Sequence, residues 1–317
     1  MSIDNYFSRF QEQSGFKSNL WIVGTTLVLF CILATNPPIL AQKGKPDGVY
    51  SKKCPQRITN LYPPAFDWRN VGGHNFVSPV KNQLSCYACT AFAVTATLES
   101  VALIQYFNEG SNTLLENLSE TTLFFCQNMY RPCNSTQEVP DALRYCRDTG
   151  LMSTTGLGNY RAIAEACKGA YGSAKCNNKI KEFRDEYCNT QKQGIKIRIV
   201  VKISDYGMFF NPISIKEHIA TKGPVIFSFR CDEKKFINYK GECKDGIFQI
   251  DPSGGDSHSA CCIGYDDQRK AWLCKNSMGT DWGDDGFFWL AYLDDNEKNY
   301  EYLIAYYIDG IVEVEEE

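Results

Sequence analysis

The longest apolar pattern in the chain runs from Cys89 to Phe107. Within this stretch only Glu99 is charged, and apolar residues fall on every side of a helical wheel: Ala91, Phe92, Val94, Ala96, Leu98, Val101, Leu103, Ile104 and Phe107. The pattern predicts a helix that is buried on all faces. Asn108-Glu109-Gly110 supplies its stop signal.

The start of this predicted helix lies near Cys89, which gives the thiol a special position. Unpaired backbone N–H groups and the positive end of the helix dipole point at the first residues of a helix. Both stabilise a thiolate, the reactive form of cysteine. Cys89 is therefore a candidate nucleophile, and the alternative is that it is one more disulfide partner.

A second pattern, near the C-terminus, predicts a β-hairpin that begins with His258. Residues 259–265 have strand character, residues 266–270 form a polar turn, and residues 271–274 return as a second strand. A hairpin centred near residue 267 would place His258 directly opposite Asn276. An Asn amide oxygen there can accept one ring N–H, which fixes the tautomer and frees the other nitrogen to serve a nucleophile. The alternative is a strand-end histidine with no task.

The two remaining histidines are expected to be bystanders. His218 lies in an amphipathic segment, residues 214–220, that ends at Gly223-Pro224, and we expect its side chain to be exposed. His74 follows Gly72-Gly73 and is expected in a loop.

The N-terminal region contains a shorter apolar run, from Leu20 to Ala34, which is followed by Pro37-Pro38. It is shorter than the roughly 20 residues that a spanning helix needs. We therefore interpret residues 1–41 as a signal peptide rather than a retained signal anchor, although residues 20–41 could tether the protein to a membrane. Residues 42–60 are polar and read as a linker or short pro-segment, and the globular domain is expected at 61–317.

Composition narrows the class of protein. The 317 residues carry a net charge of −4, which argues against a nucleic-acid partner. An apolar content of 44% is enough to bury a core. The 15 cysteines are too many for a typical cytosolic enzyme. They indicate an oxidising compartment, which means the lumen of the secretory pathway, a lysosome or the extracellular space.

Five ordered motifs resemble those of papain-family cysteine proteases of the cathepsin type. They are Asp67-Trp68-Arg69, Pro79-Val80-Lys81-Asn82-Gln83, Cys86-Tyr87-Ala88-Cys89, Leu118-Ser119-Glu120 and residues 275–283. The resemblance implies an α+β, papain-like two-lobed fold. Residues 61–195 would form a mainly helical lobe and residues 196–317 a mainly β lobe, with the substrate cleft between them.

The resemblance also implies the roles of four residues. Cys89 would be the nucleophile, His258 the general base and acid, and Asn276 the amide that orients the imidazole. Gln83 would donate to the oxyanion of the tetrahedral intermediate. The implied activity is that of a cysteine endopeptidase that acts on polypeptides as a monomer, without a metal or other cofactor.

Several positions depart from the family pattern around the expected cleft. The chain has Leu84 where the family has Gly, Tyr87-Ala88 in place of Gly-Ser, and Thr90 and Met278 where the family has Trp. The expected cleft residues are Tyr87, Ser135, Thr136, Ser257 and Trp282. These departures leave two alternatives open: a weakly active or inactive binding protein on the same scaffold, and a disulfide-rich adhesion module. Asn117 and Asn134 head glycosylation sequons.

Cysteine pairing is expected partly by resemblance, which implies Cys86–Cys133 and Cys126–Cys167, with Cys176 as the rival partner of Cys126. Cys231 and Cys243 are a plausible local pair. The cysteines on the apolar strands are expected to be buried free thiols: Cys261, Cys262 and Cys274.

The spacing of the motifs predicts an insertion. His258 follows Cys89 by 169 residues, against roughly 130 to 150 for this family. The Cys- and Lys-rich stretch at 164–193 is the expected insertion. Residues 126–200 contain no His, unlike the loop with which cathepsin B trims carboxyl ends, and this favours an endopeptidase. Because residues 42–60 are too short for a helical inhibitory propeptide, Cys54 is a hypothetical cap on the Cys89 thiol.

Overall fold

The structure is a computed structural model that describes residues 62–111, 117–128, 131–154, 160–188, 199–209, 211–293 and 302–313. The chain divides into two compact units between Leu61 and Tyr62, and the described residues belong to the second unit. The expected signal segment, the pro-segment and Cys54 lie outside the described residues.

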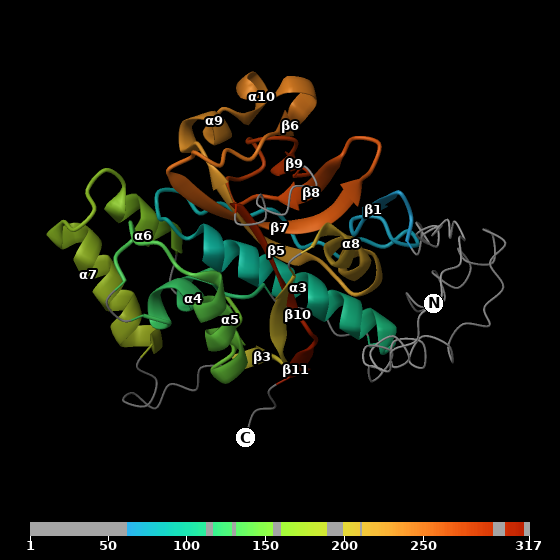
Figure 1. The fold of residues 1–317 in the computed structure, drawn as a ribbon. Helices are drawn as coiled ribbons and strands as arrows, with labels where there is room; N and C mark the ends of the chain where they lie inside the picture. The colour runs from blue at the N-terminus through green and yellow to red at the C-terminus, as the bar shows by residue number, and fades with distance from the viewer. Residues whose placement is uncertain are drawn as a thin grey trace, which may run out of the picture. The chain divides into compact units, whose positions relative to one another are not determined.

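Helix α3 (Cys89–Asn108) runs through the centre of this unit (Figure 1). As predicted, it begins at Cys89, is buried on all sides and ends just before Gly110, whose φ of 68° is accessible to glycine. The helices that accompany it are α4 (Glu120–Cys126), α5 (Val139–Asp148), α6 (Tyr160–Cys167) and α7 (Ala174–Phe183). A π-helical turn at Arg184–Cys188 continues α7.

An eight-stranded, almost entirely antiparallel sheet packs against α3. Its strand order is β4-β10-β5-β7-β8-β9-β6, and β1 pairs with β7. The strands are β1 (Ala65–Asp67), β4 (Tyr206–Phe209), β5 (Val225–Cys231), β6 (Ile247–Phe248), β7 (Asp256–Asp266), β8 (Ala271–Lys275), β9 (Phe287–Ala291) and β10 (Leu303–Ile308). Strand β7 is buried from His258 to Tyr265, and both α3 and α8 contact it.

Three short helices border this sheet, and a small second sheet joins distant parts of the chain. The helices are α8 (Pro212–Thr221), α9 (Glu233–Ile237) and α10 (Tyr239–Glu242). The second sheet has the order β11 (Ile311–Glu313), β3 (Ile199–Ile203), β2 (Leu151–Met152). The helical and β parts are therefore linked by backbone pairing as well as by side chains. Helices and an antiparallel-rich sheet together confirm the expected α+β class.

Three disulfides lie in the helical part, and only one matches its expected pairing. Cys86–Cys133 is present as the resemblance implies. The expected Cys126–Cys167 bridge is wrong, because Cys167 pairs with Cys176 and Cys126 pairs with Cys188. The physical reason is local. The connection between α6 and α7 is tight, with Gly169 and Gly172 at positive φ, and it brings Cys167 close to Cys176.

The remaining expectations about thiols have mixed outcomes. Cys231 keeps a free, buried thiol, so the expected pair with Cys243 is not formed. Cys261, Cys262 and Cys274 are buried free thiols, as predicted. Cys146 is also free and buried.

His218 is not the exposed side chain that its amphipathic segment predicts. Its ring packs between Phe209, at 5.2 Å, and Tyr307, at 5.1 Å between ring centroids. Its Nε2 is buried and has no hydrogen-bond partner among the described residues. Burial, with a smaller effect of Lys222, lowers the pKa of His218 to about 4. His74 is exposed in a loop, as expected, and its ring contacts Phe107.

Disulfide loop length predicts unequal stabilisation by two of the bridges. Cys126–Cys188 spans 62 residues and Cys167–Cys176 spans 9, and closing the longer loop removes more entropy from the unfolded chain. We expect Cys126→Ala/Cys188→Ala to lose about 4 kcal/mol of unfolding free energy and Cys167→Ala/Cys176→Ala about 2.5 kcal/mol. Urea unfolding of the two double variants measures the difference. Equal losses would contradict the expectation.

The buried His218 predicts a stability that falls with acidification. Its folded pKa of about 4 lies below the unfolded value of about 6.5, so the unfolded chain binds the proton first as pH drops. Stability should therefore decline from about pH 6.5 to about pH 4, by at most about 1.4 kcal/mol per pH unit. His218→Phe should flatten this slope in urea unfolding, whereas His74→Gln, the exposed control, should leave it unchanged.

Candidate active site

Cys89 is the first residue of α3, and the backbone before it leaves the helix terminus open. The N-cap residue is Ala88, which provides no side-chain acceptor. The backbone amides of Thr90 and of Ser259, on strand β7, act on the Cys89 thiol and lower its pKa.

The environment of Cys89 favours its thiolate. Burial raises the pKa of the thiol, but the hydrogen bond to His258 and the charge of that imidazole lower it, and the N–H groups of Ser259 and Thr90 lower it further. The net pKa lies below the usual 9.0. Cys89 as a whole residue is half-buried. These are the features of a reactive cysteine.

His258 joins Cys89 to Asn276. Its Nε2–H donates to the Asn276 Oδ1 at 2.8 Å, which leaves Nδ1 as the ring nitrogen that faces the sulfur. The imidazole is buried and rests on the rings of Phe229 and Phe236, at 5.7 and 4.7 Å. The three side chains that the sequence singles out therefore lie in one row, in which His258 bonds to Asn276 and lowers the pKa of Cys89.

The strand register that predicted this contact is wrong, although the contact forms. Cys261 pairs with Lys275 and Cys262 with Cys274, and an irregularity follows before Gly264. This register would place Met278 opposite His258, and Asn276 comes after the end of β8. His258 and Asn276 are a diagonal pair, whose side chains can still meet across two strands.

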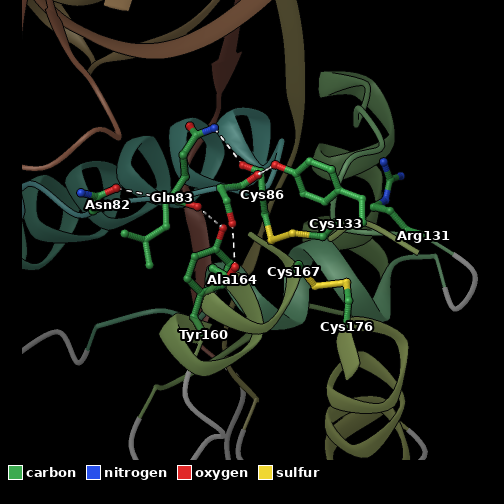
Figure 2. The surroundings of a disulfide bond; sticks show 12 residues. Asn82, Gln83, Cys86, Arg131, Cys133, Tyr160, Ala164, Cys167 and Cys176 are labelled. Atoms are coloured by element: carbon green, nitrogen blue, oxygen red, sulfur yellow. Dashed lines mark hydrogen bonds between the residues drawn. A yellow bond between two sulfur atoms is a disulfide. The ribbon is translucent and has the colours of Figure 1, made fainter. Parts of the chain in front are cut away.

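Gln83 is fixed from several directions beside this row (Figure 2). Its Nε2 donates to the Cys86 carbonyl at 3.0 Å, and its Oε1 accepts from the Ser277 hydroxyl at 2.6 Å. Its own carbonyl accepts from the Tyr160 hydroxyl at 2.6 Å. An amide nitrogen has two N–H groups, so the Cys86 carbonyl uses only one of them.

Thr90 and Ser259, which the sequence does not single out together, link helix α3 to strand β7. The Thr90 hydroxyl donates to the Gln137 carbonyl at 2.7 Å and lies 3.1 Å from the Ser259 hydroxyl. All three residues are buried. The sequence gives only one sign of this contact, which is that each hydroxyl residue lies in an otherwise apolar segment. The hydroxyl at position 90 thus has a structural partner in this chain.

A buried charge cluster lies behind the row and includes the lone charge of α3. Lys81 Nζ contacts Glu99 Oε1 at 2.8 Å and Glu120 Oε1 at 2.6 Å. Ser78 donates to Glu99 and accepts from Lys275 Nζ at 2.9 Å. Burial raises the pKa of Glu120 and lowers that of Lys275, whereas the two glutamates outweigh burial and raise the pKa of Lys81.

The expected cleft residues divide into two groups. Tyr87 is 44% exposed, and its N–H donates to the Cys133 carbonyl, which precedes Ser135 and Thr136. Ser257 is exposed next to His258, while Trp282 packs on Phe236 with ring centroids 5.0 Å apart. Phe236 in turn contacts His258. One group therefore lies near the Cys86–Cys133 disulfide, and the other lies near the imidazole of His258.

A cysteine at a helix start, close to an imidazole and on an α+β scaffold, is an arrangement typical of thiol proteases. Residues 62–308 match the family model described as papain family cysteine protease. The chain belongs to this family, which confirms the resemblance seen in the motifs.

Individual relatives are distant. The chain is 28% identical to mouse cathepsin 7 over 246 residues and 29% identical to cat procathepsin L over 249 residues, in each case 74% of this chain and 62% of the relative. The matched region therefore spans about three fifths of those relatives. Among solved structures, bromelain of Ananas comosus with the E64 inhibitor has a TM-score of 0.54 at 25% identity and covers 78% of this chain and all of that one. A Carica candamarcensis cysteine protease has a TM-score of 0.52 at 22% identity, over 78% and 99% of the two chains.

Two threonines of α3 provide a test of the bond between helix and strand. Thr90→Val should destabilise the protein by about 1 to 3 kcal/mol, because it leaves both the buried Ser259 hydroxyl and the Gln137 carbonyl without this partner. Thr95→Val is the matched control, since the Thr95 hydroxyl is buried and has no partner among the described residues. It should be neutral or stabilising. Urea unfolding of both variants compares them, and equal effects would contradict a bond between the two elements.

Proposed function

We propose that this protein is a cysteine-type endopeptidase in which Cys89, His258 and Asn276 act as a catalytic triad. The observation that carries the proposal is the position of His258, which hydrogen-bonds to Cys89 on one side and to Asn276 on the other. An imidazole held in this way can accept the thiol proton and return it later.

The proposed reaction is acyl transfer through a thioester. The Cys89 thiolate attacks the peptide carbonyl carbon, and His258 protonates the nitrogen of the leaving amine as the C–N bond breaks. Water then attacks the thioester carbonyl while His258 takes its proton, and the C–S bond breaks, which releases the carboxylic acid and restores the Cys89 thiolate beside the protonated His258. Asn276 keeps the ring in the orientation that serves both steps.

Gln83 is proposed to stabilise the tetrahedral intermediates. One of its amide N–H groups is held by Cys86, and the other would donate to the negative oxygen together with the backbone N–H of Cys89. A donor of this kind contributes about 2.7 to 4 kcal/mol to transition-state stabilisation. The bond from Ser277 to Oε1 supports this orientation, because it directs the nitrogen end of the amide away from Ser277.

The inactive binding protein is the less favoured alternative. Met278 and Thr90 replace residues usual in the family, yet the His258–Asn276 bond and the lowered pKa of Cys89 are present beside them. Both features support catalysis, whereas binding alone requires neither.

We further propose that the protein works on polypeptides in the secretory pathway, a lysosome or the extracellular space. Three disulfides support an oxidising compartment, and the cathepsin relatives support a proteolytic role. Among the described residues, one helix, α3, is long and apolar enough to cross a membrane, and 83% of its most apolar window is buried inside the fold. A tether through residues 20–41 remains a proposal based on the sequence alone.

Selective alkylation tests the nucleophile. Iodoacetamide at neutral pH should label Cys89 first, because burial raises the pKa of Cys231 and of Cys261 to about 12. Cys89→Ala should abolish both the fast labelling and peptide hydrolysis, and His258→Ala should lower kcat/KM by about 100- to 10,000-fold. Peptide mapping and a library of fluorogenic peptides provide the measurements.

Cys231→Ala is the matched control, since it removes a nearby thiol that has no proposed catalytic role. It should retain fast labelling of Cys89 and hydrolysis. Folded wild-type protein that neither labels at Cys89 nor cleaves any peptide would overturn the proposed activity in favour of the binding protein.

A further inference from the structure

Asn276 has one satisfied and one unsatisfied end. Its Oδ1 accepts from His258 at 2.8 Å, but its Nδ2 is buried and has no hydrogen-bond partner among the described residues. The residue is only 3% exposed. A buried amide nitrogen without an acceptor costs about 1 to 3 kcal/mol, so this end of the side chain calls for a partner.

A small cavity lies against Asn276. Its wall comes from α3, from the start of α4 and from the ends of β7 and β8, and includes Ala93, Ala96, Glu120, Lys275 and Ser277. Its volume is about 10 Å³, measured as space open to the centre of a water molecule. About 10 to 15 Å³ is the smallest volume that holds a water, so the cavity has room for one water at most.

Glu120 is the acceptor in the wall of this cavity. Its side chain is buried, and its contact with Lys81 uses Oε1. A carboxylate has about four acceptor positions, so capacity remains. Lys81 does not compete for a water in the cavity, because its three N–H groups already have Glu99, Glu120 and the Leu118 carbonyl as acceptors.

We propose that Glu120 is a positioning residue for the active site: one buried water in this cavity accepts the free N–H of Asn276 and donates to the Glu120 carboxylate. The inference rests on the proposed function, since the Glu99–Glu120–Lys81 cluster would help to orient Asn276 in the Cys89–His258–Asn276 row.

The chain of bonds acts by distinguishing the two ends of an amide. The oxygen and nitrogen of Asn276 have nearly the same shape, so packing alone does not select one orientation. A water that donates one proton to the Glu120 carboxylate keeps two lone pairs, and one of them can accept the N–H of Asn276, which has no other acceptor among the described residues. The oxygen end is then left for His258, which needs an acceptor when it is protonated beside the Cys89 thiolate.

A cavity-filling variant tests the proposal without touching any of the hydrogen-bonded residues. Ala96→Val adds apolar volume to the cavity wall and should displace the water, whereas Ala96→Ser offers a hydroxyl in its place. Ala102→Val is the matched control, because Ala102 is buried in the same helix but does not line the cavity. Glu120→Gln removes the charge that orients the water while keeping the side-chain shape.

The readout is the pH profile of Cys89 alkylation, which a purely structural change does not move. Ala96→Val and Glu120→Gln should raise the apparent pKa of Cys89 and slow alkylation at mildly acidic pH by about fivefold, which is the effect of one hydrogen bond of about 1 kcal/mol. Ala96→Ser and Ala102→Val should keep the wild-type profile. An unchanged profile in folded Ala96→Val or Glu120→Gln protein would overturn the proposal.

A high-resolution crystal structure of the Cys89→Ser protein gives a second, independent decision. Density for one water between Asn276 Nδ2 and the Glu120 carboxylate is expected, and an empty cavity would overturn the proposal even if every variant failed to fold. Wild-type protein that cleaves peptides with an empty cavity refutes the water alone. Wild-type protein with the water in place that never labels at Cys89 refutes the proposed function instead.

Discussion

The structure depends on one constraint, which is that helix α3 is apolar on every side and must be covered on every side. Strand β7 covers one face, and α4 and α5 cover others. Because each of these elements approaches the same helix, the start of α3 becomes the point where the helical and β parts meet. A thiol at that start is held next to a histidine on β7 as a consequence of packing. The geometry of the candidate site thus follows from the burial of a helix.

How far the sequence could predict the structure depends on the range of the interaction. The extent of α3 and the burial of Cys261, Cys262 and Cys274 follow from periodicity, which is local. The pairing of Cys126 depends on how α6 and α7 fold back on each other, which no pattern encodes. The partner of His258 was right although the register was wrong, because two strand positions lie within reach of one side chain. His218 was misread because an amphipathic helix does not reveal that aromatic rings from two strands cover its polar side.

The contacts of Thr90 explain why this chain can have a small polar residue where the family has Trp. Thr90 fills its position with a hydroxyl that bonds to two other segments. A hydrogen bond between helix α3 and strand β7 thus replaces the apolar contact area, and the exclusion of water, that an aromatic side chain at position 90 would provide. The exchange keeps the two elements in register, since hydroxyl bonds are directional whereas apolar contacts are not.

The disulfide-rich segment from Tyr160 to Cys188 contacts the loop that carries Gln83. The Tyr160 hydroxyl bonds to the Gln83 carbonyl, the Ala164 carbonyl accepts from Ser85, and Tyr171 donates to the Ser85 carbonyl. Two bridges, Cys167–Cys176 and Cys126–Cys188, hold this segment together (Figure 2 shows the first). The segment acts as a brace for the loop that carries Gln83. Under the role proposed for Gln83, a substitution within this brace would change how that amide is oriented, at a distance from any residue that a substrate is proposed to touch.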